Sequence, residues 1–165
     1  METNIGREAS IYLKYIINHY HCLPDTVCFV HGHLHSYHQR YDTLTALSIA
    51  EGMNYAFVTL NGQWDYLRDY EWGEAIPRFK HSFPKFWKRF GKLLDTDGTD
   101  GTIADSSAQF CVQKHLIQRL PLAAWKLLLD ELVKSGLKKR DLGLEGAIHL
   151  ELVWHLLFGQ CQNMT

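Results

Sequence analysis

The sequence predicts an α/β fold: one layered domain over residues 1–165, with a mostly parallel sheet flanked by helices in a partial Rossmann-like arrangement. Two short apolar runs, 27–30 and 55–60, are rich in the β-branched and aromatic residues typical of buried strands. A helical pattern over 42–52 separates them, and a strand–helix–strand unit favours parallel strands over a helix bundle. Because the chain has 165 residues and is 46% hydrophobic, it can bury one substantial core, so a single domain is expected.

The first half of the chain contains two expected helices. Asn4 can cap a helix that begins near Gly6, and apolar and aromatic side chains then recur at helical spacing as far as Tyr20. Asp42 can cap the second helix, which Gly52 ends. Each helix adjoins a predicted strand in the sequence, so both are expected to cover the sheet.

The second half contains a third expected strand and two further helices. Residues 106–112 form an apolar, strand-like segment that leads into the core. Pro121 begins a helix with an apolar face, and Gly136 is expected to end it. The last helix is expected over 144–158, with Gly159 as its stop.

Charge and hydropathy exclude two classes of partner. The formal net charge is −1, which gives no overall attraction to nucleic acid, and the lysine-rich face of a short helix expected over 84–94 is typical of a solvated surface. No apolar stretch approaches the roughly 20 residues needed to span a bilayer, and the first residues lack the pattern of a secretion signal. We therefore expect a soluble chain that binds no nucleic acid and contains no membrane span.

Two other patterns are expected to be structural. The four cysteines form no Cys-x-x-Cys pair, and Cys28 and Cys111 lie in apolar segments, where a thiol usually behaves as a small hydrophobic group. The acidic turn 95–101 lacks the glycine and glutamate positions of an EF-hand loop. A solvated turn is therefore favoured over a metal site in that segment.

The densest group of chemically active side chains follows the first strand. Residues 31–38 contain four of the ten histidines. Because side chains alternate across a strand, His31 and His33 are expected to share one face, where two imidazoles can chelate a metal ion or hold an anionic group. Imidazole also titrates near neutral pH and can act as an acid or a base. The alternative is a polar loop whose histidines contact solvent and the backbone.

The last helix carries a second pair of candidate catalytic residues. Glu151 and His155 are four positions apart and share a face with apolar neighbours. A carboxylate in apolar surroundings acquires the raised pKa that suits a general base. The alternative is an ordinary helix pair that supports the fold.

Six motifs cover most of the chain, apart from the stretch 61–105: Asn4-x-Gly6-Arg7-Glu8-Ala9, Tyr12-Leu13-x-Tyr15-Ile16-Ile17, Leu23-Pro24-Asp25, Phe29-x-His31-Gly32-His33, Ser107-Ala108-Gln109-Phe110 and Trp154-His155-x-x-Phe158-Gly159. Together they resemble an uncharacterised family of domains of unknown function from eukaryotic microbes. That family is in turn distantly similar to nucleotide-sugar glycosyltransferases of the GT-A type.

The glycosyltransferase similarity implies a divalent metal. In those enzymes an apolar strand ends in an Asp-x-Asp motif, which holds the metal on the diphosphate of the donor. Here His31 and His33 take that place as metal ligands. Imidazole suits zinc or manganese better than magnesium, so either the metal differs or none is used.

The similarity also implies the remaining site residues. Asn4, Arg7 and Glu8 open the helix that contacts the donor, and Arg7 with the helix N-terminus can neutralise phosphate charge. Gln109 lies on the strand that completes the binding site. Glu151 occupies a place where such enzymes carry a base or an acceptor contact.

Three functions follow as hypotheses. The first is a glycosyltransferase-like domain, active or degenerate, with a nucleotide sugar and a hydroxyl acceptor as partners. The second is a zinc-type hydrolase that uses His31 and His33, and the third is a non-catalytic binding domain. Members of the resembled family usually carry a further amino-terminal segment, so the chain is expected to be either the carboxy-terminal portion of a larger domain or a shortened relative that cannot bind a nucleotide sugar. A glycosyltransferase role would imply the secretory pathway.

Overall fold

A computed structural model describes residues 5–35, 39–53, 55–61, 65–66, 103–104, 108–139 and 144–159. The elements in these segments are α1 (Arg7–His19), β1 (Thr26–Phe29), α2 (Thr43–Glu51), β2 (Phe57–Thr59), β3 (Asp65–Tyr66), β4 (Ile103–Ala104), β5 (Phe110–Gln113), α4 (Lys114–Ile117), α5 (Leu122–Lys139) and α6 (Leu144–Leu157). In this part of the chain, no helix is long and apolar enough to cross a membrane.

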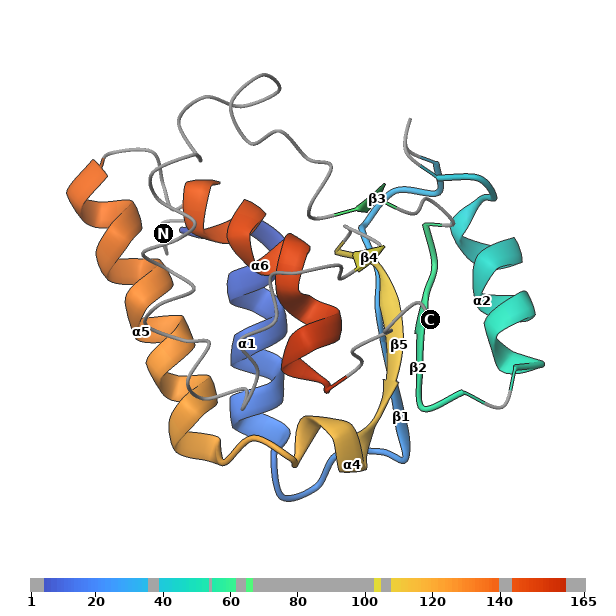
Figure 1. Cartoon of the computed structure of the whole chain (residues 1–165), viewed down its shortest axis with the longest axis horizontal. Helices are drawn as coiled ribbons and strands as arrows, with labels where there is room; N and C mark the ends of the chain where they lie inside the picture. The colour runs from blue at the N-terminus through green and yellow to red at the C-terminus, as the bar shows by residue number, and fades with distance from the viewer. Residues whose placement is uncertain are drawn as a thin grey trace.

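The main sheet has three strands in the order β1-β5-β2, and every pairing is antiparallel. The expected mostly parallel, Rossmann-like sheet is therefore wrong, although the chain does mix helices with strands. Since β1 and β2 are each antiparallel to β5, they run in the same direction, as the strand–helix–strand unit suggests. They are not neighbours, however, because β5 lies between them (Figure 1). A local pattern identifies strands but does not show that a distant third strand separates two of them.

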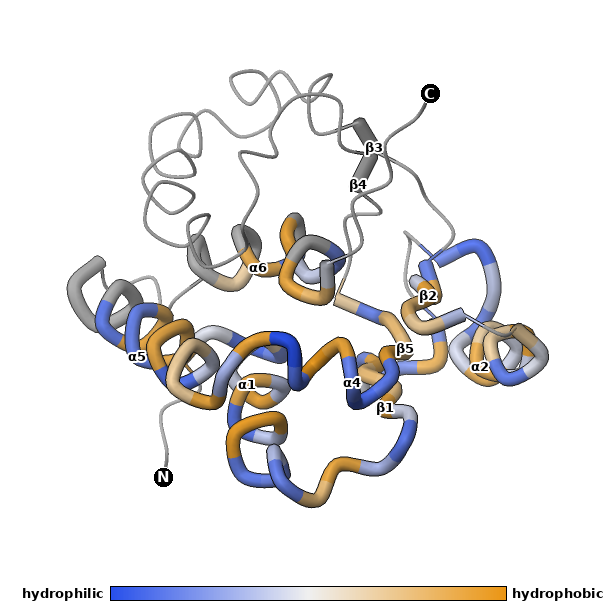
Figure 2. The backbone as a smooth tube through the Cα atoms, turned by 60° about the horizontal axis from the view of Figure 1, so that its bottom comes forward, coloured by the Kyte–Doolittle hydropathy of each residue, from blue (hydrophilic) through white to orange (hydrophobic). Residues whose placement is uncertain are grey.

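The sheet is covered on both faces by helices. One face, with Phe29, Phe57 and Phe110, packs against α1, α5 and α6, which lie together on one side of the sheet in Figure 1. The opposite face packs Val58 and Cys111 against α2. This alternation follows from the pleat, which sends successive side chains to opposite faces. Figure 2 shows the resulting run of hydrophobic segments through α5, α1 and β5.

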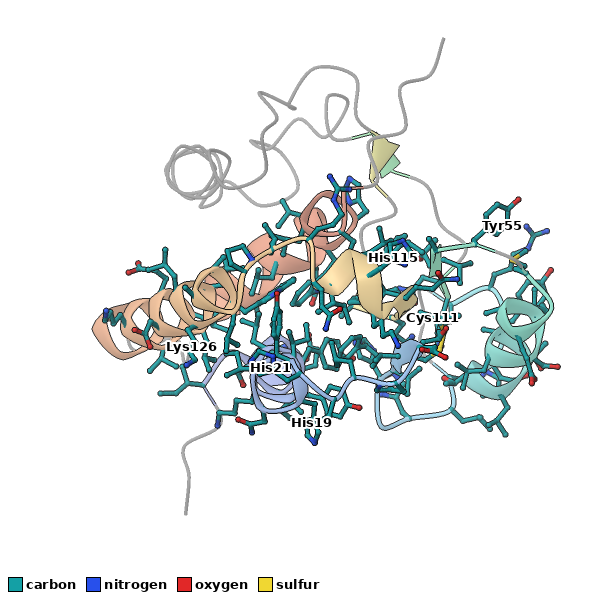
Figure 3. The ribbon with its side chains drawn as sticks, turned by 90° about the horizontal axis from the view of Figure 1, so that it is seen from below. His19, His21, Tyr55, Cys111, His115 and Lys126 are labelled. Atoms are coloured by element: carbon teal, nitrogen blue, oxygen red, sulfur yellow. A yellow bond between two sulfur atoms is a disulfide. The ribbon has the colours of Figure 1, made fainter. Side chains whose placement is uncertain are left out.

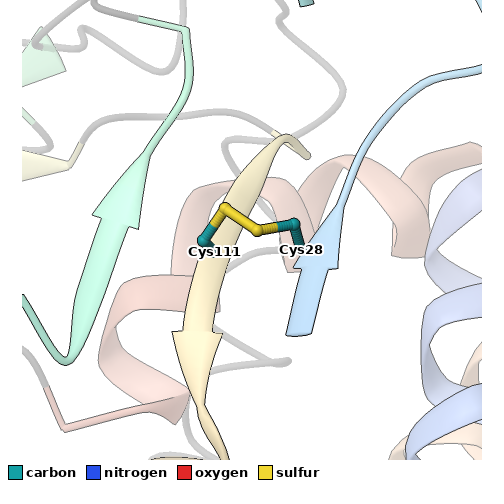
Figure 4. Close-up of a disulfide and its surroundings, with 2 residues drawn as sticks. All are labelled: Cys28 and Cys111. Atoms are coloured by element: carbon teal, nitrogen blue, oxygen red, sulfur yellow. A yellow bond between two sulfur atoms is a disulfide. The ribbon is translucent and has the colours of Figure 1, made fainter. Parts of the chain in front are cut away.

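A disulfide joins Cys28 of β1 to Cys111 of β5 (Figure 4). The two residues are direct partners in the strand register, with their Cα atoms 4.0 Å apart. The expected structural role is confirmed for Cys28 and Cys111, but as a disulfide rather than as separate hydrophobic thiols, and Cys22 is an exposed free thiol. The pairing depends on the register between segments 83 residues apart, which the sequence pattern does not show.

The expected helix boundaries at Asp42, Gly52 and Gly159 are confirmed, whereas the end at Gly136 is wrong and α1 is capped by Gly6 rather than by Asn4. The Asp42 side chain accepts a hydrogen bond from the backbone N–H of Thr45 (2.9 Å) and caps α2. The backbone of Gly159 adopts a positive φ of 72° directly after α6, as a helix stop requires. Helix α5 continues through Gly136 to Lys139, because one interior glycine costs only about 1 kcal/mol relative to alanine.

Three sequence expectations concern other parts of the chain. The short helix over 84–94 and the acidic turn 95–101 lie outside the described residues. The third strand is present as β5, which begins at Phe110. A second, two-stranded antiparallel sheet of β3 and β4 was not expected.

Candidate functional site

The beginning of α1 has an unusual backbone that only glycine permits at one position. Gly6 has a φ of 82°, and a Cβ added to it would lie 2.5 Å from Cδ2 of Leu132 on α5. The next residue, Arg7, also has a positive φ, of 48°. A left-handed conformation is costly for a residue with a side chain. The packing of α5 against Gly6 therefore fixes where the first turn of α1, with Arg7 and Glu8, lies.

Two carboxyl groups from different helices meet beside this first turn. The side chain of Glu8 on α1 is hydrogen-bonded to the side chain of Glu151 on α6. Burial raises the pKa of Glu151 to about 8, and the hydrogen bond and charge of Glu8 add to this rise, while the positive charge of Arg7 opposes it. Near neutral pH, burial therefore keeps the Glu151 carboxyl largely protonated beside Glu8, and the exposed Arg7 lies in the same first turn as Glu8.

Tyr12 lies one helical turn after Glu8, near the Glu8 and Glu151 side chains. Burial raises the pKa of its hydroxyl, and the charges of Glu8 and Glu151 raise it further, so the hydroxyl stays protonated. Its ring centroid is 4.7 Å from that of Phe29 and 6.2 Å from that of Trp154. The sequence pattern assigned Tyr12 to the apolar face of its helix. The signal that could have marked it is its spacing of four residues from Glu8.

The neighbours of Glu151 on α6 are more deeply buried than Glu151 itself. Trp154 is 1% exposed and His155 is 5% exposed, whereas Glu151 is partly exposed. Burial lowers the pKa of His155 to about 4, so its ring is neutral at physiological pH. Within the described residues, neither the indole N–H of Trp154 nor either ring nitrogen of His155 has a hydrogen-bond partner. Of the two predicted catalytic residues on α6, Glu151 is therefore the more exposed and His155 the more buried.

The two predicted metal ligands form a second group after β1. The ring centroids of His31 and His33 are 5.0 Å apart, so the imidazoles are neighbours, but β1 ends at Phe29 and strand alternation is not the cause. The carbonyl oxygen of His33 accepts a hydrogen bond from the Thr43 hydroxyl (3.2 Å). Across the described ranges, no cluster of three or more histidine, cysteine, aspartate or glutamate side chains is placed to hold a metal ion.

Three other histidines lie on different elements from this pair. Figure 3 places His19 and His21 at the carboxyl end of α1 and His115 on α4, so these three come from elements other than the His31 segment.

Gln109 connects the ends of the strands. It is 0% exposed, and its Oε1 accepts a hydrogen bond from the backbone N–H of His31 (3.0 Å). Its Nε2 donates to Oδ1 of Asn61 (3.1 Å), and Asn61 is 1% exposed. These contacts hold the segment after β1 against the segments that flank β2 and β5. The predicted role of Gln109 in cofactor binding therefore lacks support from its described contacts, which are internal.

The structure thus brings part of the predicted site together. Glu8 is hydrogen-bonded to Glu151 and the charge of Arg7 acts on Glu151, whereas His31 and His33 form a separate group on the segment after β1. The packing of Tyr12 on Phe29, two residues before His31, connects the helix that carries the first group with the strand that leads to the second. Asn4 lies outside the described residues.

Comparison with protein families gives one match. The family described as "Protein of unknown function (DUF3431)" matches residues 1–165, so the chain belongs to this family. No curated protein and no solved structure matches the chain. The expected membership of an uncharacterised family is confirmed, whereas the similarity to glycosyltransferases receives no support from these comparisons.

Proposed function

For this member of the DUF3431 family, we propose that Glu8, Glu151 and Arg7 form an acid–base site that transfers a group to a hydroxyl compound. The observation that carries the proposal is the hydrogen-bonded carboxyl pair, with a cation beside it. Perturbed carboxyl groups of this kind are concentrated at catalytic sites, although ion-pair networks in the fold produce them too. Both residues are of intermediate exposure rather than fully buried, which supports a role that requires contact with a substrate.

The chemistry follows from the shared proton. Two carboxyl groups in contact resist double ionisation, so the pair holds one proton and one negative charge around neutral pH. The ionised carboxylate can accept the proton of a substrate hydroxyl while the oxygen of that hydroxyl attacks the group that is transferred. The same pair can then return a proton to the leaving group. Acid–base catalysis of this kind typically contributes 10²- to 10⁴-fold to a rate.

Arg7 indicates what else the substrate carries. Its guanidinium is exposed at the N-terminus of α1, where the backbone N–H groups and the helix dipole also favour negative charge. A phosphate or diphosphate group suits this position. In the form that the family resemblance suggested, the reaction is glycosyl transfer from a nucleotide sugar, with His31 and His33 as further contacts to the diphosphate or to a zinc or manganese ion.

The alternative of a zinc hydrolase receives less support. Catalytic zinc sites use three protein ligands, and the described residues supply two neighbouring imidazoles without a third ligand beside them. The third hypothesis, a non-catalytic binding domain, does not explain why two carboxyl groups are held in contact at a cost in stability.

A donor screen tests the proposal. The purified chain is incubated with uridine and guanosine diphosphate sugars, with glycerol as acceptor, and release of nucleoside diphosphate is measured with and without zinc or manganese. We expect Glu151→Gln to lower the rate at least 100-fold while the protein stays folded. Asp130→Asn is the matched control, because it removes an exposed carboxylate on α5. Equal rates in Glu151→Gln and the parent protein, or no release from any donor by the folded parent, would refute the proposal.

A further inference from the structure

We propose that Tyr12 binds a hydroxyl group of the substrate between its own hydroxyl and the Glu8–Glu151 carboxyl pair, and that the site takes a polyol or sugar. This inference rests on the proposed acid–base site and names the substrate class for it. Tyr12 was not among the residues expected to be functional from the sequence, where its ring reads as part of the hydrophobic core.

The first argument is the state of the Tyr12 hydroxyl. Tyr12 is 6% exposed, and its buried hydroxyl has no hydrogen-bond partner among the described residues. It is nevertheless close enough to Glu8 and Glu151 for both charges to act on it. A buried hydroxyl without a partner is costly, and most buried polar groups in native proteins are hydrogen-bonded. Since the charges of both carboxyl groups act on it, this hydroxyl is placed to donate to a polar group that also contacts them.

The second argument is chemical complementarity. An alcohol group has one proton to donate and lone pairs to accept with. Tyr12 is held in its protonated form, so it can donate to the ligand oxygen, while the ionised member of the carboxyl pair accepts the ligand proton. The hydroxyl that is bound in this way is also the one positioned to lose its proton in the proposed reaction.

The third argument favours a ligand with several hydroxyl groups. Trp154 supplies another buried donor, its indole N–H, which also has no partner within the described segments. Its ring centroid lies 6.2 Å from that of Tyr12. Two separate unpartnered donors and a carboxyl pair suit a molecule with more than one oxygen. Glu8 and Glu151 are both of intermediate exposure, so this place lies near the surface of the described fold.

Ligand-observed saturation-transfer NMR tests the inference with glycerol, myo-inositol and glucose as probes. We expect at least one probe to give a signal with the parent protein, and Tyr12→Phe to remove that signal. Tyr15→Phe is the matched control, because it deletes a hydroxyl from the same helix one turn away, where the ring packs against Phe29 and His19. The control should keep the signal. If no probe binds the folded parent protein, or if Tyr12→Phe binds as the parent does, the inference is wrong.

Thermal unfolding separates a ligand contact from a structural one. A hydroxyl that serves the ligand can be deleted without lowering Tm, whereas a hydroxyl that stabilises the fold cannot. We expect Tyr12→Phe to unfold at the same temperature as the parent protein or at a higher one. A lower Tm would assign the hydroxyl to the fold and overturn the inference.

The two proposals fail in different ways. Loss of the probe signal in Tyr12→Phe, combined with no turnover of any donor, would leave the binding site standing and remove the proposed reaction. If turnover depends on Glu151 but polyol binding does not depend on Tyr12, the proposed reaction stands and the proposed role of Tyr12 is removed.

Discussion

The buried polar side chains at the end of the main sheet differ from those between α1 and α6 in whether they are hydrogen-bonded. At the sheet end, both ends of the Gln109 amide have partners, the backbone of His31 and the side chain of Asn61. Between the helices, the Tyr12 hydroxyl and the Trp154 indole N–H have none within the described residues. The sheet end follows the usual rule for buried polar groups, and the helix contact departs from it. Such departures are expected at functional sites, where local stability gives way to chemistry.

Removing the disulfide should give the largest loss of stability, and it tests the main sheet. In the loop-closure model, a cross-link between residues 83 apart in sequence stabilises the fold by about 4–5 kcal/mol. We expect the double variant Cys28→Ala/Cys111→Ala to lose about this much free energy of unfolding, as measured by urea titration. Cys22→Ala, which removes an exposed free thiol, should change it by less than about 0.5 kcal/mol. A loss below 1 kcal/mol in the double variant would show that the sheet does not depend on the bridge.

Removing the Gln109 amide should give the next largest loss of free energy of unfolding. Gln109→Leu keeps the volume but leaves the His31 N–H and the Asn61 oxygen without this partner in a buried place, which we expect to cost about 2–4 kcal/mol. Gln118→Leu is the control: its exposed amide donates to the Tyr20 carbonyl, and its loss should cost less than about 1 kcal/mol. Similar values for the two variants would mean that the sheet end is no more tightly bonded than the surface.

The pH dependence of stability tests the contact between α1 and α6. The pKa of Glu151 is raised on folding, so the native state binds its proton more tightly and stability falls as pH rises from the ordinary glutamate value to about 8. The pKa of His155 is lowered to about 4, so stability falls as pH drops from about 6.5 to 4. The two effects oppose each other between about pH 4.5 and 6.5, and above that range Glu151 acts alone.

We therefore expect the free energy of unfolding to decrease between pH 6.5 and 8 by at most about 2 kcal/mol, since one proton contributes about 1.4 kcal/mol per pH unit. Glu151→Gln should abolish this decrease, and His155→Phe should extend it down to about pH 4.5. Urea titrations at each pH provide the measurement. A stability that rises over this interval in the parent protein, or a decrease retained in Glu151→Gln, would show that the carboxyl pair is not protonated as described.

Two hydroxyl groups on or next to α1 provide the smallest and most direct comparison. Tyr12→Phe deletes a buried hydroxyl without a partner and should raise the free energy of unfolding by up to about 1 kcal/mol. Tyr20→Phe deletes a hydroxyl that donates to the Leu120 carbonyl (2.8 Å) and should lower it by about 1 kcal/mol. Opposite signs would confirm the contrast between the two regions, and equal signs would contradict it.

The elements were predictable from the sequence to the extent that their signals are local. The cap at Asp42 and the stop at Gly159 depend on neighbouring residues, and both are where the sequence places them. The order of strands is not local, because the position of β5 between β1 and β2 is decided by packing on both faces of the sheet. The same holds for the disulfide, which required the strand register.

The candidate site shows the same division. The Glu151–His155 spacing on one helix is a local pattern, and it correctly drew attention to α6. The partner of Glu151 is Glu8, 143 positions earlier in the chain, and the sequence shows no reason for these two to meet. Glu8 entered the predicted site only through a family motif, in a different role. Tyr12 was missed because an aromatic residue at helical spacing is ordinary core until its hydroxyl is seen to lack a partner.

The disulfide between β1 and β5 also constrains the order in which the chain can fold during synthesis. Cys28 leaves the ribosome long before its partner, because 83 residues at 5–20 residues per second take roughly 4–17 s. During that interval Cys22, six positions before Cys28, is available to form an incorrect Cys22–Cys28 bond. The strand β1 must wait for β5 before the three-stranded sheet can close. A chaperone or thiol isomerase that protects Cys28 during this interval would therefore increase the yield of the native fold.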